Sequence, residues 1–496
     1  MSGPRATIES VDQFSNEALL SQTEAEAERL VAAWIITNGP VPRALQWRAL
    51  LLRALDRHGE AADLLRRAAA ADPQNPSIAQ SLAQVSLEAG LPADTLFERA
   101  LQLDPASSVG RLGLISAYFA AGKGQMALDL LEGALTANPG WIAGHAQFAQ
   151  LSTLIGQPGR GLDTLLAAID RFPDHLEFRI QALKILLLAG HFERALALAE
   201  ASIARLGDLP VLLVDQAAAL DELGQSAHAA AIFGKAGPAA DCAHACWLLR
   251  HHLRRGDPAT ALVVAEPWLR HEQATQVWPY VALAWRMMDD PQADWLEAQP
   301  GLIGTADLAG KIDLAALADC LRRVHAGSGR FVDQSVRGGT QTDGPLFSRI
   351  EPEVAAARRE ISRAMRTHLA ALPPIDRRHP QLAERRDRPV RYSGSWSVRL
   401  VDQGFHTSHH HPLGWFSAVF YLAAPPELAG EEGQLVLGAP PPELGLDLAA
   451  FRQFAPSPGK LVIFPSTMWH ATLPFSKGER MTIAFDTARP FGGDMT

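Results

Sequence analysis

A cluster of histidines near the C-terminus holds the residues of this 496-residue chain whose types and spacing could do chemistry. Four histidines fall within the six residues from His406 to His411, and a lone His470 follows, ten residues ahead of Arg480. Imidazoles are common ligands of transition metals, and a site with open positions takes its ligands from at least two places in a fold. The spacing therefore predicts a metal site made from one clustered pair and one distant histidine.

The clustered pair is expected to be His409 and His411. Side chains two residues apart on a strand point to the same face, and these two histidines have that spacing. His410 then points to the opposite face and is left out of the predicted site. His406 lies three residues before His409 and also faces away in a regular strand, although a β-bulge could re-aim it.

The distant ligand, His470, lies in a later strand-like segment, residues 466–472, and Arg480 lies on the strand after it. Three histidines on one side of a metal leave about three positions of an octahedral shell free. The planar guanidinium of Arg480 suits a bidentate grip on a carboxylate. The pattern thus combines a metal site with a cationic group that can hold an acid.

Short β-rich runs separated by Pro/Gly turns are predicted to position these side chains. They are residues 394–400, 417–422, 433–438, 460–464 and 480–486. Many short strands with such punctuation are typical of a sandwich or barrel. Ahead of them, residues 351–372 are predicted to form an amphipathic helix. Its apolar side carries Val354, Ile361, Met365 and Leu369. The polar run from Gln334 to Thr342 is either a strand and loop bordering the site or a domain-entry loop.

The first three-fifths of the chain is a repeat array. Glycines recur at steps of 31 to 34 residues, at Gly59, Gly90, Gly122, Gly156, Gly190, Gly224 and Gly256. A proline follows each of the first five glycines by 14 to 20 residues. Glycine permits the turn from one helix into the next, and proline ends the second helix and begins the next unit. The period predicts stacked helix–turn–helix units over about residues 43–260.

This pattern resembles the tetratricopeptide repeat, whose period is 34 residues. The early repeats are shorter, and several units lack the aromatic positions of that family. The resemblance implies an α-solenoid whose concave groove often holds an extended peptide, so a peptide or protein substrate on the repeats is expected. The alternative is that the array only spaces, dimerises or caps the catalytic domain.

Other notable residues of the helical part have structural interpretations. Cys242 and Cys246 lie one helical turn apart, but a zinc site takes four ligands and no second Cys/His pair is near, so buried cysteines are expected. His251 and His252 are expected on a solvated helix face. Packing is expected for Trp278, Trp285 and Trp295.

Composition, with 47% apolar and 20% charged residues, fits a soluble globular protein. A formal charge of -9 without a basic stripe or tail argues against nucleic acid as a partner. Three cysteines give no disulfide framework and indicate a reducing cytoplasm. No signal peptide is recognised, and no apolar run reaches the roughly 18–20 residues that span a bilayer, so no membrane is expected as a partner.

The C-terminal motifs resemble the 2-oxoglutarate- and Fe(II)-dependent dioxygenases, above all the branch with prolyl-hydroxylase-like double-stranded β-helix domains. The matching segments are GFHTSHHH (404–411), FYL (420–422), GQLVL (433–437), PSPGKLVIFP (456–465), His470 and Arg480-Met481-Thr482. Their order and spacing match the family over about residues 390–490. The arrangement also looks like a bacterial group of such oxygenases that often carries tetratricopeptide repeats.

The resemblance implies that His409 and His470 are ligands of Fe(II). The carboxylate ligand of the family is replaced by His411. Either His411 binds the iron, which gives a three-histidine site, or two histidines hold it together with an exogenous ligand. A neutral third ligand leaves the site one unit more positive, which should weaken Fe(II) binding.

The resemblance also assigns residues to the cosubstrate, 2-oxoglutarate. Arg480 is expected to bind its distal carboxylate, with Thr482 assisting. His406 stands where relatives often place a tyrosine that contacts the cosubstrate. Tyr392 and Trp396 are expected to line the pocket.

The sequence thus predicts an α + β multidomain protein. An N-terminal α-solenoid of tetratricopeptide-like helix pairs is expected over residues 1–290, a connecting segment over 291–330, and a double-stranded β-helix (jelly-roll) domain over 331–496. The predicted activity is that of a cytoplasmic dioxygenase that hydroxylates a peptide or protein with iron, 2-oxoglutarate and molecular oxygen. Two alternatives are a cupin-type metal enzyme that does not use 2-oxoglutarate, which leaves Arg480 unexplained, and a repeat scaffold with a degenerate oxygenase domain.

Overall fold

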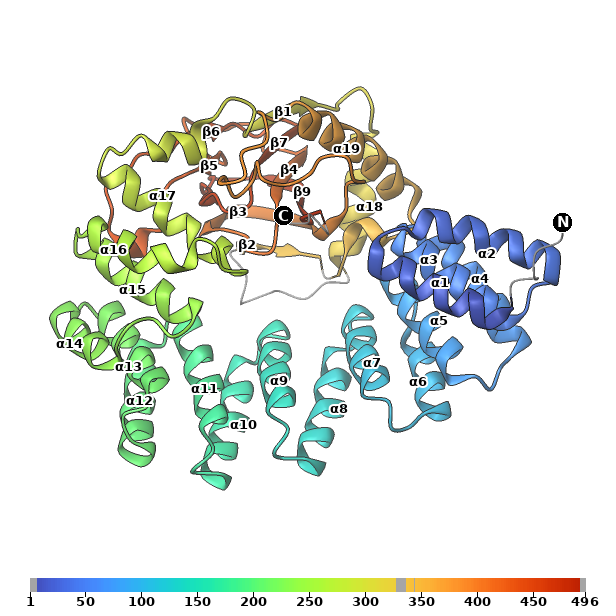
Figure 1. Cartoon of the computed structure of the whole chain (residues 1–496), viewed down its shortest axis with the longest axis horizontal. Coiled ribbons are helices and arrows are strands. Elements are labelled where there is room, and N and C mark those ends of the chain that lie inside the picture. The colour runs from blue at the N-terminus through green and yellow to red at the C-terminus, as the bar shows by residue number, and fades with distance from the viewer. Residues whose placement is uncertain (1–6, 327–335, 343, 491–496) are drawn as a thin grey trace.

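The helices form an arch, and the strands form a curled antiparallel sheet that lies between the two ends of this arch (Figure 1). The computed structural model describes residues 7–326, 336–342 and 344–490. An α-solenoid followed by a jelly-roll domain is therefore confirmed. Gln334 and Ser335 of the predicted polar run lie outside the described residues.

The arch consists of consecutive antiparallel helices. Its α-helices are α1 (Ile8–Ser21), α2 (Glu24–Asn38), α3 (Pro42–Ala54), α4 (His58–Ala71), α5 (Pro76–Glu88), α6 (Asp94–Leu103), α7 (Ser108–Ala120), α8 (Gly124–Ala137), α9 (Ile142–Leu154), α10 (Pro158–Arg171), α11 (Leu176–Leu188), α12 (Phe192–Leu206), α13 (Pro210–Glu222), α14 (Ser226–Ala236), α15 (Cys242–Arg254), α16 (Pro258–Ala265) and α17 (Trp278–Met287). Short helical turns η1 (Glu266–Trp268), η2 (Ala274–Gln276) and η3 (Asp294–Ala298) complete it.

The recurring glycines make the turns between paired helices, as predicted. Left-handed backbone, which glycine adopts without strain, occurs at Gly90, Gly122, Gly156, Gly190, Gly224 and Gly256. Gly59 is the exception, because it lies inside α4 and Asp56 takes the left-handed position (φ 61°) in its place. The prediction is therefore wrong for the first of the seven glycines, where the turn comes three residues earlier.

The strands form one sheet in the order β1-β7-β4-β9-β3-β8-β5-β6, with β2 paired to β3. They are β1 (Gly304–Asp307), β2 (Val336–Gln341), β3 (Tyr392–His409), β4 (Phe416–Ala423), β5 (Leu435–Leu437), β6 (Arg452–Phe454), β7 (Lys460–Pro465), β8 (His470–Thr472) and β9 (Glu479–Thr487). Two further turns are η4 (Leu346–Ser348) and η5 (Pro442–Leu444). The long β3 matters most for the site, because it pairs with β2, β8 and β9.

Two helices cover one face of the sheet. They are α18 (Leu314–Ala326) and α19 (Pro352–Ala370), and the second is the predicted amphipathic helix. The apolar residues predicted for its inner side are all buried in the core of the domain. The predicted connecting segment is itself structured, since β1 pairs with β7 and α18 packs into the same core. The boundaries at residues 290 and 330 stay predictions.

The N-terminal end of the arch is attached to the jelly-roll domain by ion pairs. Arg391 Nη2 donates to Glu24 Oε2 at 2.7 Å, and Arg358 pairs with Asp56. Glu24 is almost fully buried at this contact, with 3% of its surface exposed. The backbone amide of Ile350 also donates to Ala89 O at 3.3 Å.

The C-terminal end of the arch is attached through aromatic side chains. Trp469 Nε1 donates to Pro279 O at 3.1 Å, and the Trp469 ring contacts Tyr280 of α17 edge to face. The three predicted packing tryptophans of this region lie in one cluster with ring centroids 6.0 to 6.3 Å apart. Trp469 directly precedes His470, so this attachment adjoins the predicted metal site.

Cys242 is buried and Cys246 half-buried, and each Sγ lies 3.6 Å from a backbone carbonyl. The expectation for the histidines beside them is wrong in part. His251 is buried, with 1% of its surface exposed, whereas His252 is half-buried. No helix in the described part of the chain is long and apolar enough to cross a bilayer.

His251 is buried because it bonds to a carboxylate. Asp221 of α13 accepts hydrogen bonds from His251 Nδ1 at 2.8 Å, Ser226 Oγ at 2.9 Å and Arg254 Nη1 at 2.7 Å. Burial alone raises the pKa of Asp221, but the hydrogen bonds from His251, Arg254 and Ser226 outweigh it and bring this pKa to about 2. A charged aspartate therefore ties α13 to α15 near the C-terminal end of the arch.

Replacement of this aspartate should destabilise the arch. We expect Asp221→Asn to lower the free energy of unfolding by about 1.5–3 kcal/mol, because it removes the charged acceptor of the buried hydrogen bonds from His251, Ser226 and Arg254, while Arg254 keeps its pair with Glu222. Denaturant titration followed by circular dichroism measures this. Since the pKa of Asp221 is depressed in the folded protein, its stabilisation is present above the unfolded pKa of 3.8 and is lost as pH falls toward about 2. The difference in the free energy of unfolding between wild type and Asp221→Asn should therefore become smaller over this pH range. The control is Asp174→Asn, which breaks the exposed pair with Arg205 and should cost below about 1 kcal/mol.

Candidate metal centre

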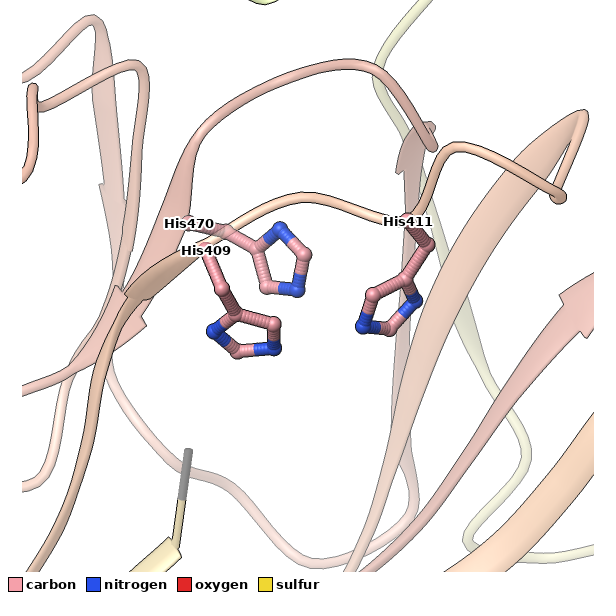
Figure 2. A group of neighbouring side chains, drawn as sticks. All are labelled: His409, His411 and His470. Atoms are coloured by element: carbon pink, nitrogen blue, oxygen red, sulfur yellow. The ribbon is translucent and has the colours of Figure 1, made fainter. Parts of the chain in front are cut away.

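Three histidines converge at one end of the curled sheet (Figure 2). His409 ends β3, His411 follows it, and His470 begins β8. His409 and His470 are directly paired across these two strands, and the ligand atoms of all three lie within 4.8 Å of one another. Among the described residues this is the one group of histidine, cysteine or carboxylate side chains placed to hold a metal ion.

The hydrogen bonds behind the three rings fix which nitrogen faces the centre. His409 Nδ1 lies 2.7 Å from Thr407 O, and His470 Nδ1 lies 3.0 Å from Met468 O. His411 Nδ1 lies 2.7 Å from a carboxylate oxygen, Oδ1 of the aspartate at position 486. These oxygens can only accept, so each Nδ1 carries the hydrogen, and each Nε2 presents its lone pair. The three Nε2 atoms are therefore the nitrogens that could bind a metal ion.

Burial favours the neutral form of two of these imidazoles, those of His409 and His470. It lowers the pKa of His409 to about 4, with a further contribution from neighbouring His411. It also lowers the pKa of His470 well below the ordinary value of 6.5. Neutral imidazole is the form that binds metals, so His409 and His470 are ready to do so at neutral pH.

A cavity of about 240 Å³ opens beside the histidines. Its walls come from β2, β3, β4, β5, β7, β8 and β9. Residues that the sequence assigned to the site line it: Trp396, His406, His409, His411, His470, Arg480 and Thr482. The cavity is below the range of drug-sized sites, which run from about 300 to 1,000 Å³, and fits a small metabolite.

Arg480 is the cationic group of this cavity. Its side chain is 1% exposed and lies over the Tyr421 ring, 5.0 Å from the centroid. Nε donates to Gly433 O at 3.2 Å, and Nη2 lies 3.4 Å from the Tyr421 hydroxyl. Nη1 has no partner in the described part of the chain. A buried guanidinium with a free edge is suited to an anionic ligand, and Thr482 follows on the same face of β9.

His406 reaches the cavity because β3 is irregular. The register of β3 against β8 shifts between His406 and His409, which is the bulge that the sequence left open. Within the described residues, the buried His406 Nε2 has no hydrogen-bond partner. A buried polar atom without a partner costs about 1–3 kcal/mol, so this nitrogen also indicates a ligand that the protein alone does not supply.

Tyr392 does not line the cavity, and the sequence-based expectation for it is wrong. Its hydroxyl lies 2.6 Å from Ser362 Oγ, and its ring packs edge to face on Phe347 and Phe485. The register of β3 against β9 shifts between Tyr392 and Gly394. Tyr392 therefore does not share the face of Trp396, although four residues separate them.

His410 faces away from the centre, as predicted. Its ring contacts Trp469 edge to face, with centroids 4.8 Å apart, and lies 6.3 Å from Tyr280 of α17. Burial lowers its pKa to about 3. His410 thus packs against the arch while its two neighbours in the chain face the cavity.

Three residues at the site were not predicted as site residues from the sequence: Asp486, Ser417 and Gln341. Gln341 and Ser417 line the cavity, and Asp486 lies behind His411. Asp486 could have been predicted from its spacing, since it follows Arg480 and Thr482 by even numbers of residues on one strand and so shares their face. Gln341, on β2, shows that the predicted polar run is a strand bordering the site.

Comparison with known families agrees with this geometry. Residues 394–486 match the family described as "Putative 2OG-Fe(II) oxygenase". A domain that matches this family therefore lies in the C-terminal part of the chain. No curated protein matches the sequence significantly.

Solved structures similar to this chain are tetratricopeptide-repeat proteins that match the helical arch. MamA from Desulfovibrio magneticus RS-1 is 16% identical, with 35% of this chain and 100% of that chain covered and a TM-score of 0.30. A tetratricopeptide repeat protein from Parabacteroides merdae is 17% identical, covering 47% and 94%, with a TM-score of 0.30. YrrB, described as having an unusual peptide-binding site, is 19% identical, covering 37% and 95%, with a TM-score of 0.26.

The residues present fit the metal and the cosubstrate that this oxygenase family implies. Three imidazole Nε2 donors suit Fe(II), which accepts imidazole ligands. Arg480, with a free guanidinium edge, and His406, with a buried nitrogen lacking a partner, suit an acid such as 2-oxoglutarate. The family's direct carboxylate ligand is absent, and His411 occupies its place.

Proposed function

We propose that the jelly-roll domain is an Fe(II)- and 2-oxoglutarate-dependent dioxygenase that hydroxylates a peptide or protein substrate recruited by the repeats. The observation that carries the proposal is the convergence of three Nε2 donors and a buried arginine on one cavity. This combination explains Arg480, which a cupin-type enzyme without 2-oxoglutarate would not use.

In this proposal His409, His411 and His470 hold Fe(II) through Nε2. Iron with 2-oxoglutarate supplies oxidative decarboxylation, in which one oxygen atom of O₂ goes to succinate and the other to the hydroxylated product. The Arg480 guanidinium grips the distal carboxylate of the cosubstrate, and Thr482 assists beside it. His406 Nε2 accepts or donates a hydrogen bond at the cosubstrate, according to its tautomer.

The apolar residues of the cavity wall would exclude water and position the substrate. Trp396 and Phe464 give the cavity apolar walls, and the rings of Trp396 and His411 lie 5.5 Å apart. Such walls keep bulk water from the reacting centre and position the substrate carbon. The repeats would present an extended segment of the substrate, which is how solenoids commonly use their concave surface.

The test is an anaerobic titration of metal-free protein with Fe(II) and then 2-oxoglutarate, followed by the weak visible metal-to-ligand charge-transfer band. We expect the band only when both are present. His411→Ala should weaken Fe(II) retention, because His411 supplies one of three donors. If His411→Ala retains iron as wild type does, two histidines and an exogenous ligand hold the metal. No band and no iron retention in wild type would instead favour a repeat scaffold with a degenerate oxygenase domain.

A further inference from the structure

Asp486 is a buried carboxylate directly behind one of the three histidines. It lies near the end of β9, with 8% of its surface exposed, and its Oδ1 accepts from His411 Nδ1 at 2.7 Å. His411 is its single ion-pair partner among the residues the structure describes. No arginine or lysine there pairs with it, so His411 is the titratable group that this buried carboxylate faces.

The three histidines differ in this respect. Backbone carbonyls hold His409 and His470, whereas a carboxylate holds His411. His411 is also the residue that stands where the resembling family has a carboxylate ligand. The carboxylate is therefore not lost from this site but lies one side chain further from the metal position.

Neighbouring residues hold Asp486 in place. The Ser417 hydroxyl donates to Asp486 Oδ1 at 2.6 Å and lies 3.0 Å from Ser466 Oγ. Gly414 packs closely against them, since a Cβ there would lie 2.4 Å from Ser466 Oγ and 3.1 Å from Asp486 Cβ. Side chains and packing thus fix the carboxylate toward His411.

We propose that Asp486 is a positioning residue that acts through His411 and supplies the negative charge missing from the three-histidine metal shell. This rests on the proposed metal site. A carboxylate that accepts from Nδ1–H fixes the tautomer and makes Nε2 a stronger donor, and removal of such partners typically costs about 10–100-fold in metal affinity. It also offsets the positive charge that a neutral third ligand leaves on the metal.

The test is anaerobic calorimetry of Fe(II) and Co(II) binding by the full-length metal-free protein. We expect Asp486→Asn, which keeps the size and an acceptor oxygen but removes the charge, to lower affinity about 10–100-fold. The visible spectrum of bound Co(II) should shift, because His411 becomes a weaker donor. Asp402→Asn removes the same charge from an exposed aspartate that bonds to the Gly478 amide, and should bind as wild type does.

A double-mutant cycle separates charge donation from a general effect on the fold. In the His411→Ala background Asp486→Asn should change Co(II) affinity little, because the residue through which it acts is gone. An equal loss in both backgrounds overturns the proposal, as does an unchanged affinity and spectrum in Asp486→Asn alone. If wild type itself binds neither metal, the proposed function fails instead.

Discussion

His470→Ala is expected to abolish tight metal binding, with a loss of more than about 100-fold, which exceeds the range for removal of an outer-sphere partner. His470 is 6% exposed, is paired with His409 across the two strands, and has its Nδ1 bonded to Met468 O. Its removal leaves two donors, and alanine offers no substitute. Equilibrium dialysis with metal analysis measures the loss, and the charge-transfer band should disappear with it.

The matched control is His410→Ala, because His410 belongs to the same cluster but faces α17. It should keep metal stoichiometry and lose thermal stability, since truncation of the half-buried ring removes its packing against Trp469. The metal-site assignment would be falsified if His470→Ala binds metal as tightly as wild type while His410→Ala does not. Melting of the metal-free proteins shows whether each variant is folded.

Arg480→Gln should have the second-largest effect, on 2-oxoglutarate and not on the metal. Loss of one partner of a buried charge pair costs about 2–5 kcal/mol, so we expect cosubstrate affinity to fall about 30-fold or more. Fe(II) affinity without 2-oxoglutarate should stay near that of wild type, because Arg480 is not one of the three candidate donors. The 2-oxoglutarate affinity of Arg480→Lys should lie between those of wild type and Arg480→Gln, since an ammonium keeps the charge but lacks the planar fork of the guanidinium.

Arg399→Gln is the control for this arginine. Arg399 lies on the adjacent β3, but its Nε bonds to Glu479 at 2.6 Å and it does not line the cavity. Its replacement should leave 2-oxoglutarate affinity unchanged. Equal losses in the two variants would show that the effect comes from the sheet and not from a grip on the cosubstrate.

Local periodicity explains what the sequence could predict of the site. Arg480 and Thr482 share a face because they are two residues apart on β9. The same spacing predicted the pair of His409 and His411, although β3 ends at His409 and His411 lies just after it. The structure places all four around one cavity. Asp486 follows the same two-residue spacing on β9, but its partner His411 lies in the connection between β3 and β4, and no motif marks the aspartate.

Bulges explain what the sequence could not predict. His406 faces the cavity and Tyr392 does not, and in both cases the register of β3 shifts beside the residue. A bulge depends on how the neighbouring strand pairs, which is information outside the local pattern. The burial of His251 could not be predicted from its neighbours in the chain either, because its partner Asp221 lies 30 residues earlier on another helix.

The attachments of the arch were out of reach for a different reason. The repeat period predicted the paired helices, but the ion pair of Arg391 with Glu24 joins residues 367 apart in the chain. Trp469 and Pro279 are likewise 190 residues apart. Periodicity describes contacts between neighbouring repeats and carries no information about where the two ends of a solenoid come to lie.

The two attachments fix both ends of the arch to the jelly-roll domain. A partner that spreads or narrows it must strain either the Glu24–Arg391 end or the Tyr280–Trp469 end. The second of these adjoins His470, because Trp469 directly precedes it in the chain. We therefore expect binding of a partner to the repeats to be coupled to metal binding at the three histidines. Cleavage of the chain between the arch and the jelly-roll domain should remove this coupling.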